Sequence, residues 1–314
     1  MKHLKLFEEF INKDCPSLKK VYLATKRSSG QKWWTYKGFA GNKFFIQITE
    51  NNIDKLDIDP NYPILNYHSD ITQELLDRGL TKNKNIYNHP KDIKLSGSKE
   101  EFHKLVGNDE NIPTTVYSKK EALDQLTFPI IAKPASGHSG IGIKVIKDKS
   151  EMNDIKESEF DTFSEFIDKK EEMRFFNFRG NPIFWMERTP LNDKAKNGKG
   201  NSDEAMEFGY ALRDANNVPK DYLDVLKRFC KIYDKFPYIC FDMMKDKNGK
   251  VYVIESNSQP GVPFDSTAKI YEKIYEDFYN EPLDKSSKEK LDEYSQEMIQ
   301  RTLDKDNKRF SIKD

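Results

Sequence analysis

The sequence predicts a mixed α/β fold, and three observations support that prediction. The N-terminal region alternates an apolar strand-like run, Val21–Ala24, with apolar residues at helical spacing in Ile71–Leu76. Two later segments, 171–189 and 238–257, each have the pattern of two strands joined by a tight turn. A segment with one apolar helical face follows each of them. We therefore expect an α/β (α+β) protein.

The composition limits the class of partner. The 314 residues correspond to about two domains. The 52 basic and 52 acidic residues give a net charge of 0, which argues against binding nucleic acid or an anionic membrane by bulk charge. No apolar run approaches the ~18–20 residues of a membrane helix. We therefore expect neither a nucleic-acid nor a membrane partner.

The cysteines and the N-terminus favour a cytoplasmic protein. Cys15, Cys230 and Cys240 are odd in number and lack the spacing of metal ligands, so buried reduced thiols are expected. The first ten residues include two glutamates where a signal peptide would be apolar.

The N-terminal region is expected to form a small α/β unit. Its strand-like runs are Val21–Ala24, Phe44–Ile48 and Pro63–Tyr67. Trp33 and Trp34 lie between the first two, where they either pack in a core or form an aromatic wall that faces a substrate.

A lysine and a glycine-rich loop come next. A helix-like segment, Lys99–Val106, precedes an apolar strand that ends at Lys133. Gly137 and Gly140 follow, and such a loop lets backbone N–H groups approach phosphate while the lysine supplies a point charge. A plain flexible turn is the alternative. His138 is either a mobile loop residue or a group that contacts phosphate or transfers protons.

The most informative pattern is the acidic hairpin at 238–257. Asn248-Gly249 is a strong hairpin signal, because a type I′ turn needs positive φ at both central residues. A two-residue turn there places Asp242 directly opposite Glu255, with Asn257 on the same face. Two carboxylates and an amide oxygen suit a hard cation such as Mg²⁺ or Mn²⁺. A solvated acidic pair on an exposed face is the alternative.

The C-terminal part reads as two helices. One spans 267–279 with its apolar residues on one face, and a more charged one includes Leu291–Leu303. The second helix could pack within the chain or across a homo-oligomer, and both alternatives stay open.

Several motifs follow one another along residues 88–279. They are Asn88-His-Pro, Ser98-Lys99, Ile112-Pro-Thr-Thr, Ile131-Ala-Lys133-Pro134, the glycine loop 134–142, Ser164-Glu165-Phe166-Ile167, Glu172-Met-Arg174, Glu187-Arg188, Phe241-Asp-Met-Met and Val253-Ile-Glu-Ser-Asn-Ser-Gln-Pro-Gly261. In this order and spacing the chain resembles the ATP-grasp superfamily, most closely the carboxylate–amine ligases of glutathione-synthetase type and the RimK-like glutamate ligases.

The resemblance implies an ATP-grasp fold with nucleotide held between its two middle parts. These parts would be a central lid subdomain at 93–168 and a C-terminal antiparallel-sheet subdomain with the metal site at 169–282. An N-terminal α/β pre-ATP-grasp domain at 1–92 would lie on the substrate side, and 283–314 would form a charged helical tail.

The resemblance also implies roles for individual residues. Arg174 and Arg188 would act on the transferred group, and Asp242, Glu255 and Asn257 would bind the metal. The nucleotide contacts would be Lys99, Lys133, Ser139, Gly140, Glu165, Phe166, Ile167 and Glu172. The chain departs from the RimK-like pattern at 196–201, where the usual arginine is absent and Lys199 is the candidate substitute.

The implied activity is that of an ATP-dependent carboxylate–amine ligase. Such an enzyme uses Mg²⁺ (or Mn²⁺) and ATP to turn a carboxylate into an acylphosphate, which an amine converts to an amide. The carboxylate and the amine would be small molecules or peptides. A small-molecule kinase on the same scaffold and a catalytically silent ATP-binding module are the alternatives.

Overall fold

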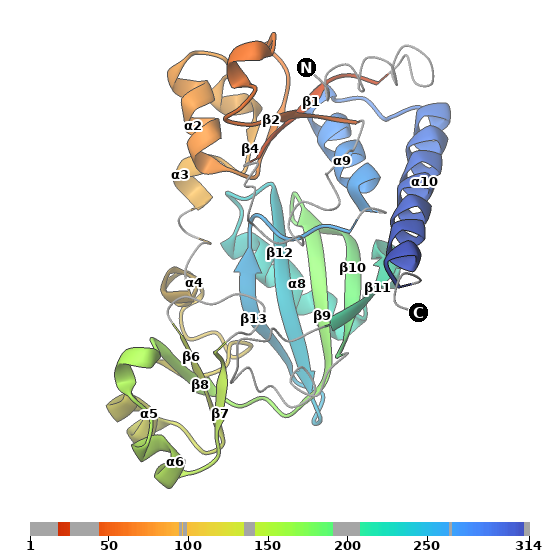
Figure 1. The fold of residues 1–314 in the computed structure, drawn as a ribbon. Helices are drawn as coiled ribbons and strands as arrows, with labels where there is room; N and C mark the ends of the chain where they lie inside the picture. Colours follow the sequence, from red (N-terminus) through yellow and green to blue (C-terminus); the bar gives the residue numbers. More distant parts are fainter. Residues whose placement is uncertain are drawn as a thin grey trace. The chain divides into compact units, whose positions relative to one another are not determined.

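A computed structural model describes residues 18–25, 44–93, 96, 99–134, 142–190, 208–263 and 266–310 (Figure 1). Trp33, Trp34, Cys15 and His138 lie outside these residues. The chain forms two compact units, and the described parts of 1–98, 233–239 and 257–314 make up the first. The second comprises 99–232 and 240–256. The domain borders expected from the sequence stay a prediction.

The first unit is built on a parallel sheet of order β2-β1-β3-β4. Its strands are β1 (Val21–Ala24), β2 (Phe45–Ile48), β3 (Ile64–Asn66) and β4 (Ile86–Tyr87). All neighbouring strands run parallel, as expected where helical crossovers connect them. The predicted N-terminal α/β unit is therefore present.

Helices cover both faces of this sheet. On one face, Ile71 and Leu75 of α2 (Ser69–Asp77) join a core cluster with Tyr22 and Ile46. On the other, the ring of Tyr271 in α9 (Thr267–Tyr279) packs against Phe44 and Phe45. A parallel sheet is stable in this arrangement because both of its faces are apolar.

The last helix, α10 (Lys285–Phe310), packs within the chain. Its residues Leu291 and Tyr294 are buried, and the Tyr294 ring lies 5.1 Å from that of Phe44 between centroids. Leu291 and Tyr294 of the predicted C-terminal helix thus pack within the first unit.

The second unit contains an antiparallel sheet of order β5-β8-β6-β7. Its strands are β5 (Thr115–Val116), β6 (Ile130–Lys133), β7 (Lys144–Ile146) and β8 (Thr162–Glu165). The helices α5 (Lys119–Gln125) and α6 (Lys149–Asn153) enclose a core with this sheet that includes Ala122, Met152 and Phe163. Figure 1 shows both helices on one side of these strands.

A five-stranded sheet of order β11-β10-β9-β12-β13 follows. Its strands are β9 (Lys169–Phe178), β10 (Asn181–Pro190), β11 (Phe208–Asp214), β12 (Tyr238–Asp246) and β13 (Val251–Asn257). Helix α8 (Lys220–Ile232) packs on it through Tyr222 against Phe175 and through Phe229 against Phe241. The other helices of the described residues are short, namely α3 (Pro90–Ile93), α4 (Lys99–Val106) and the 3-10 turns Ile53–Lys55, Asn83–Asn85, Glu157–Glu159 and Ala215–Asn217.

The turn of the β12–β13 hairpin differs from the expected one. The Asp246 N–H donates to the Lys250 carbonyl (3.0 Å) and the Gly249 N–H donates to the Asp246 carbonyl (3.2 Å), with Gly249 at φ +91°. The turn therefore has three residues, and the predicted two-residue type I′ turn is wrong. The Asp246 side chain explains the difference, because it accepts the N–H groups of Asn248 and Lys250 (2.9 and 2.8 Å).

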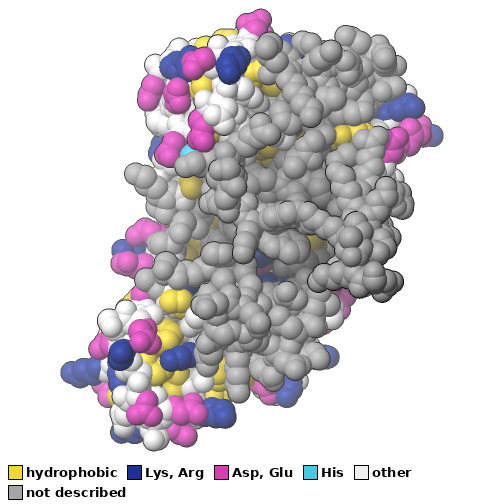
Figure 2. Space-filling model, viewed as in Figure 1, with side chains coloured by type: hydrophobic (Ala, Val, Ile, Leu, Met, Phe, Trp, Pro, Cys, Tyr) yellow, Lys and Arg dark blue, Asp and Glu magenta, His cyan; other side chains and the backbone are white. Residues whose placement is uncertain are grey.

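The described surface agrees with the balanced composition. Figure 2 shows Lys and Arg side chains intermixed with Asp and Glu on the visible face. Within the described part of the chain, no helix combines the length and the apolar character needed to cross a membrane. Cys230 and Cys240 are buried free thiols, as expected.

Candidate active site

Strand pairing brings two arginines and a glutamate to one face of the five-stranded sheet. Glu172 and Arg174 are two residues apart on β9, so they share a face. On β10, Met186 lies opposite Arg174 and Glu187 opposite Met173. One further step in this register places Arg188 opposite Glu172, which explains why these side chains meet.

These side chains form a buried ion-pair cluster with Asp242 of β12. The Arg174 guanidinium binds Asp242 in two places, Nε to Oδ1 at 2.5 Å and Nη2 to Oδ2 at 2.7 Å. Arg188 donates from Nη1 to Glu172 Oε1 and lies 3.3 Å from Asp242 Oδ2. Asp242 is 6% exposed and Glu172 is 5% exposed. We call Arg174, Arg188, Glu172 and Asp242 the arginine cluster.

A second carboxylate, Glu255 of β13, touches this cluster. Burial alone would raise the pKa of Asp242, but the Arg174 charge and hydrogen bonds outweigh it and hold that pKa at about 2. The pKa of Glu255 is instead raised, first because surrounding protein removes part of its hydration, although the residue is exposed, and second because of the Asp242 charge. The two carboxyl groups are within hydrogen-bonding contact of each other. The expected approach of Asp242 to Glu255 is therefore present as a side-chain contact, while the strand register predicted from a two-residue turn is not shown.

Two lysines expected to bind nucleotide lie in the same unit. Lys133 ends β6, and the nearby charges of Glu255 and Lys99 both influence its pKa, which burial lowers. Lys99 begins α4 and donates from Nζ to the Pro134 carbonyl at 3.0 Å. The structure thus brings Lys133 near Glu255 and Lys99 near Lys133.

One neighbour of Lys133 escaped the sequence analysis. Burial, and then the charge of Lys133, lower the pKa of His103 to about 4, so its imidazole is neutral at pH 7. His103 lies on α4, and only tertiary packing brings it to Lys133. Lys169 was also missed, and its Nζ pairs with Glu172 Oε2 at 2.8 Å.

The segment expected to meet adenine connects the two sheets of the second unit. Glu165 ends β8, with its N–H bonded to the Thr114 carbonyl at 2.9 Å. Phe166 and Ile167 follow, and Ile167 is buried. The carbonyl of Asp168 then accepts the Lys247 N–H of the hairpin turn at 3.2 Å. The connecting segment is therefore attached to the hairpin that carries Asp242 and Glu255.

The two carboxylates of the second unit fit a divalent cation that prefers oxygen. Glu255 and Asp242 are like charges in contact, an arrangement that a cation between them would relieve. Asn257 ends β13 in the first unit, two residues beyond Glu255, and its Oδ1 accepts the Gln259 N–H at 2.8 Å. Within the described ranges, no group of three or more His, Cys, Asp or Glu residues is placed to hold a metal ion. Within the second unit the expected site depends on the two carboxylates, and the metal role of Asn257 stays a prediction.

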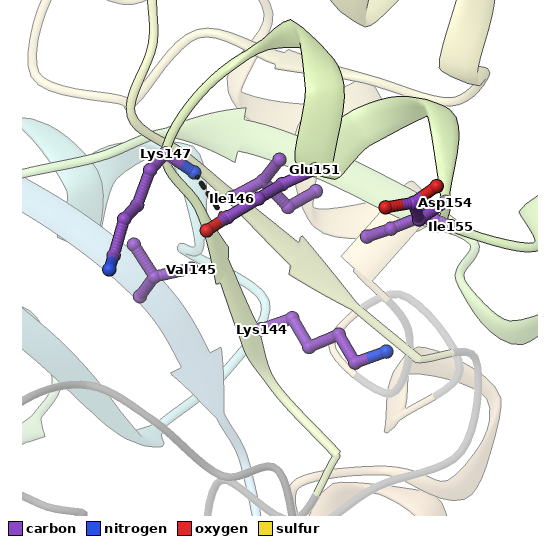
Figure 3. Close-up of a pocket in the computed structure, with 7 residues that line it drawn as sticks. All are labelled: Lys144, Val145, Ile146, Lys147, Glu151, Asp154 and Ile155. Atoms are coloured by element: carbon purple, nitrogen blue, oxygen red, sulfur yellow. Dashed lines mark hydrogen bonds between the residues drawn. The ribbon is translucent and has the colours of Figure 1, made fainter.

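Some expected contacts are not placed. Ser139, Gly140 and Lys199 lie outside the described residues. A hollow of about 290 Å³ beside β7 and α6 (Figure 3) contains none of the predicted site residues. Its lining is Lys144, Val145, Ile146, Lys147, Glu151, Asp154 and Ile155.

Comparison with known sequences gives a partial match. No protein-family model matches the chain. It is 32% identical over 152 residues to a D-alanine–D-alanine ligase of Bacillus anthracis, across 45% of this chain and 47% of that ligase. The match thus spans about half the length of the curated relatives.

Solved structures match over most of the chain. The crystal structure of D-alanine–D-alanine ligase from Bacillus anthracis has a TM-score of 0.57 at 19% identity, covering 87% of this chain and 99% of that one. Its complex with ATP gives 0.55 at 18% identity, covering 90% and 99%. The ATP-grasp ligase PsnB, complexed with a minimal precursor, gives 0.50 at 11% identity, covering 90% and 98%. At these identities the likeness concerns the fold.

Proposed function

We propose, for a chain that has the ATP-grasp fold, that it is an ATP-dependent carboxylate–amine ligase. The substrates would be a carboxylate and an amine from small molecules or peptides, and the product would be an amide. The local sequence match to D-alanine–D-alanine ligase supports ligation. The same match favours a ligase over a small-molecule kinase or a silent ATP-binding module.

The contact between Asp242 and Glu255 beside the arginine cluster carries this proposal. Asp242 forms ion pairs with Arg174 and Arg188, while Glu255 lies near the charge of Lys133. Cationic groups around a like-charged carboxylate pair are what transfer of a phosphoryl group needs, because negative charge develops on its oxygens. A structural ion pair alone would not require the second carboxylate.

The proposed reaction has two steps. A substrate carboxylate oxygen attacks the γ-phosphorus of ATP, the bond to the bridging oxygen breaks, and ADP leaves. The amine then attacks the acyl carbon of the acylphosphate, phosphate leaves, and the nitrogen loses a proton. A divalent cation at Asp242, Glu255 and Asn257 would neutralise charge on the phosphates.

The candidate site residues would bind and orient the nucleotide and the transferred group. Lys99 and Lys133 would hold the α- and β-phosphates as point charges. Arg174 and Arg188 would face the transferred group, since planar guanidinium groups bind phosphate in two places. Glu172 would accept the ribose hydroxyls, and the connecting segment 165–167 would meet the adenine.

The test is a screen for ADP formation with purified protein, Mg²⁺ and ATP. Mixtures of amino acids and short peptides serve as carboxylates and amines, and mass spectrometry identifies products. Hydroxylamine is added in place of the amine, because it converts an acylphosphate to a stable hydroxamate. The ligase account expects ADP only with a carboxylate, a hydroxamate in the trap, and an amide with the amine.

Two results would contradict the proposal. A stable phosphorylated product without hydroxamate would identify a kinase. Tight ATP binding without ADP in any mixture would favour a silent module.

A further inference from the structure

Asn88, which follows β4, holds together the two ends of the acidic hairpin. Its side chain is fully buried, and its backbone is in the left-handed region at φ +61°. The Nδ2 group donates to the carbonyls of Tyr238 (2.6 Å) and Ser258 (2.8 Å). The Oδ1 atom accepts the Tyr238 N–H at 3.2 Å. One amide thus serves three backbone groups, and we call these contacts the Asn88 clamp.

The clamp lies at the open end of the hairpin. Tyr238 is the first residue of β12, and Ser258 directly follows β13. Asp242 is four residues after Tyr238, and Glu255 is three residues before Ser258. The turn at 247–249 closes the other end. The two strands that carry the carboxylates are therefore tied at both ends, and the Asn88 side chain bonds to the backbone of both strand ends at the open one.

The residue type suits this task. Asparagine tolerates the left-handed region better than most residues, and its amide both donates and accepts as a peptide group does. Aspartate at this position would have no N–H to give to the two carbonyls. Buried carbonyls without a donor are costly, so the clamp restrains where the strands lie.

The clamp is itself fixed to the parallel sheet of the first unit. Asn66, which ends β3 and is also fully buried, donates from Nδ2 to the Asn88 carbonyl at 2.8 Å. The hydroxyl of Ser96 donates to that of Ser258 at 2.6 Å. The Tyr67 hydroxyl reaches the Pro260 carbonyl at 3.2 Å. Neighbouring contacts thus hold the same segment, and Asn88 is the member that bonds to backbone groups at the ends of both strands.

We propose that Asn88 is a positioning residue, which sets the register of the hairpin and thereby the approach of Asp242 to Glu255. The consequence for metal-dependent nucleotide binding rests on the proposed function, whereas the consequence for the hairpin does not. A cation shared by two carboxylates is sensitive to their separation. A looser hairpin should therefore weaken the response to Mg²⁺ more than it weakens ATP binding without Mg²⁺.

The experiment compares wild type with Asn88→Asp and Asn88→Gly. The aspartate removes the two donated bonds, and the glycine removes the side chain but keeps the backbone region accessible. Asn280→Gly is the matched control, because Asn280 is also left-handed (φ +54°) but is exposed at the end of α9. Ser96→Ala is a milder change at the same end of the hairpin, for use if the Asn88 variants fold poorly.

Two readouts are measured on each variant. Hydrogen exchange of the amides in 238–246 and 251–258 should become about tenfold faster in both Asn88 variants. The reason is that the loss of a buried hydrogen bond makes local opening easier by about that factor. The Mg²⁺ concentration that gives half of the enhancement of ATP binding should rise about tenfold. This is the effect expected when the residues that orient the metal ligands are disturbed. Ser96→Ala should shift both values in the same direction by a smaller factor, and Asn280→Gly should match wild type.

The outcomes separate the two proposals. Unchanged hairpin exchange in folded Asn88 variants overturns the clamp. Faster exchange with an unchanged Mg²⁺ response gives Asn88 a purely structural role and also overturns the inference. If wild type binds no ATP at all, the proposed function fails, while exchange of the Tyr238 amide still decides whether Asn88 sets the hairpin.

Discussion

Two ion-pair clusters lie on opposite faces of the same sheet, and adjacent residues of β9 supply each of them. Glu172 belongs to the arginine cluster. Glu171 pairs with Lys245 at 2.5 Å, and Lys245 also pairs with Asp221 of α8 at 2.8 Å. We call Lys245, Glu171 and Asp221 the lysine cluster. Because neighbouring strand residues point to opposite faces, one sheet carries both.

The two clusters differ in how their charges are balanced. Lys245 sits between two acids and over the Tyr222 ring at 4.7 Å. Burial would lower the pKa of Lys245, but its hydrogen bonds to Asp221 and Glu171 raise it, so every contact there favours the charged form. Beside the arginine cluster, Glu255 is pressed against Asp242 and its pKa is raised. An unfavourable carboxylate contact, rather than the number of ion pairs, therefore marks the candidate site.

Asp242→Asn should give the largest effect on both stability and turnover. It removes the shared partner of Arg174 and Arg188, and breaking a buried pair costs about 3–5 kcal/mol of unfolding free energy. Asp221→Asn in the lysine cluster should cost about 0–1 kcal/mol, because Asp221 is 46% exposed. Urea denaturation of both variants checks the difference. Equal losses would contradict the distinction between the clusters.

The pH dependence of the Asp242 contribution follows from its lowered pKa. The folded-state value of about 2 lies below the ordinary 3.8, so this stability is present above pH 3.8 and is lost as the pH falls towards 2. The difference in unfolding free energy between wild type and Asp242→Asn should shrink over this range. A constant difference from pH 5 to pH 2 would show that ionised Asp242 is not stabilised by the arginines.

Glu255→Gln should abolish turnover without destabilising the fold. Losing a residue that only orients a metal ligand lowers metal affinity or activity by about 10–100-fold. Losing a ligand itself should therefore lower turnover by at least ~100-fold. The raised pKa of Glu255, about 7 against an ordinary 4.5, means that its ionisation opposes folding. That penalty grows as the pH rises from 4.5 to 7.

Thermal unfolding at pH 8 with chelator should therefore find Glu255→Gln at least as stable as wild type. Mg²⁺-dependent ADP formation is measured in parallel. Near-wild-type turnover would remove Glu255 from the metal site, and a marked loss of stability would show that the carboxylate contact is not repulsive.

Arg188→Lys should reduce turnover by a smaller factor. Arg188 contacts both Glu172 and Asp242 through Nη1. Lysine keeps the charge but lacks the further donors of the planar guanidinium, which would bind the phosphoryl group in two places. The loss of one charge-assisted hydrogen bond in the transition state corresponds to a decrease in turnover of about 10–100-fold. Steady-state kinetics should place this loss in kcat, if Arg188 faces the transferred phosphoryl group. A change confined to the KM for ATP would instead make Arg188 a binding residue.

The smallest effects should come from the adjacent pair Glu172 and Glu171. Glu172→Gln should raise the KM for ATP by about 5–10-fold, the equivalent of one hydrogen bond to the ribose. Glu171→Gln changes the neighbouring residue on the opposite face and should leave the KM within twofold. Equal effects of the two variants would mean that the face of β9 does not matter for nucleotide binding.

The sequence predicted the local elements well and the tertiary contacts less completely. The predicted helix 267–279 coincides with α9, and the hairpin strands agree within a residue or two with β12 and β13. These elements depend on periodicity and on a glycine turn, both of which are local. The turn length was wrong because the Asp246 side chain decides it, a contact that the Asn-Gly pattern does not include.

Two long-range contacts could not be predicted, one made by His103, which the sequence analysis missed, and one by Asn88, whose motif it noted without the contacts. His103 reaches Lys133 from another element, and Asn88 reaches Tyr238 and Ser258 across 150 and 170 residues of sequence. No spacing rule connects residues so far apart. The Asp242–Glu255 contact could be predicted because both residues lie on one hairpin, in which a short turn joins two strands that are adjacent in sequence.

Calorimetric titration of ATP into the protein, with Mg²⁺ and with EDTA, tests the central claim most directly. Wild type should bind ATP at least about tenfold more tightly with Mg²⁺, as expected when a cation joins protein carboxylates to phosphates. Glu255→Gln should lose this enhancement and keep the affinity measured in EDTA. Equal enhancement in wild type and Glu255→Gln would show that the acidic hairpin does not hold the metal.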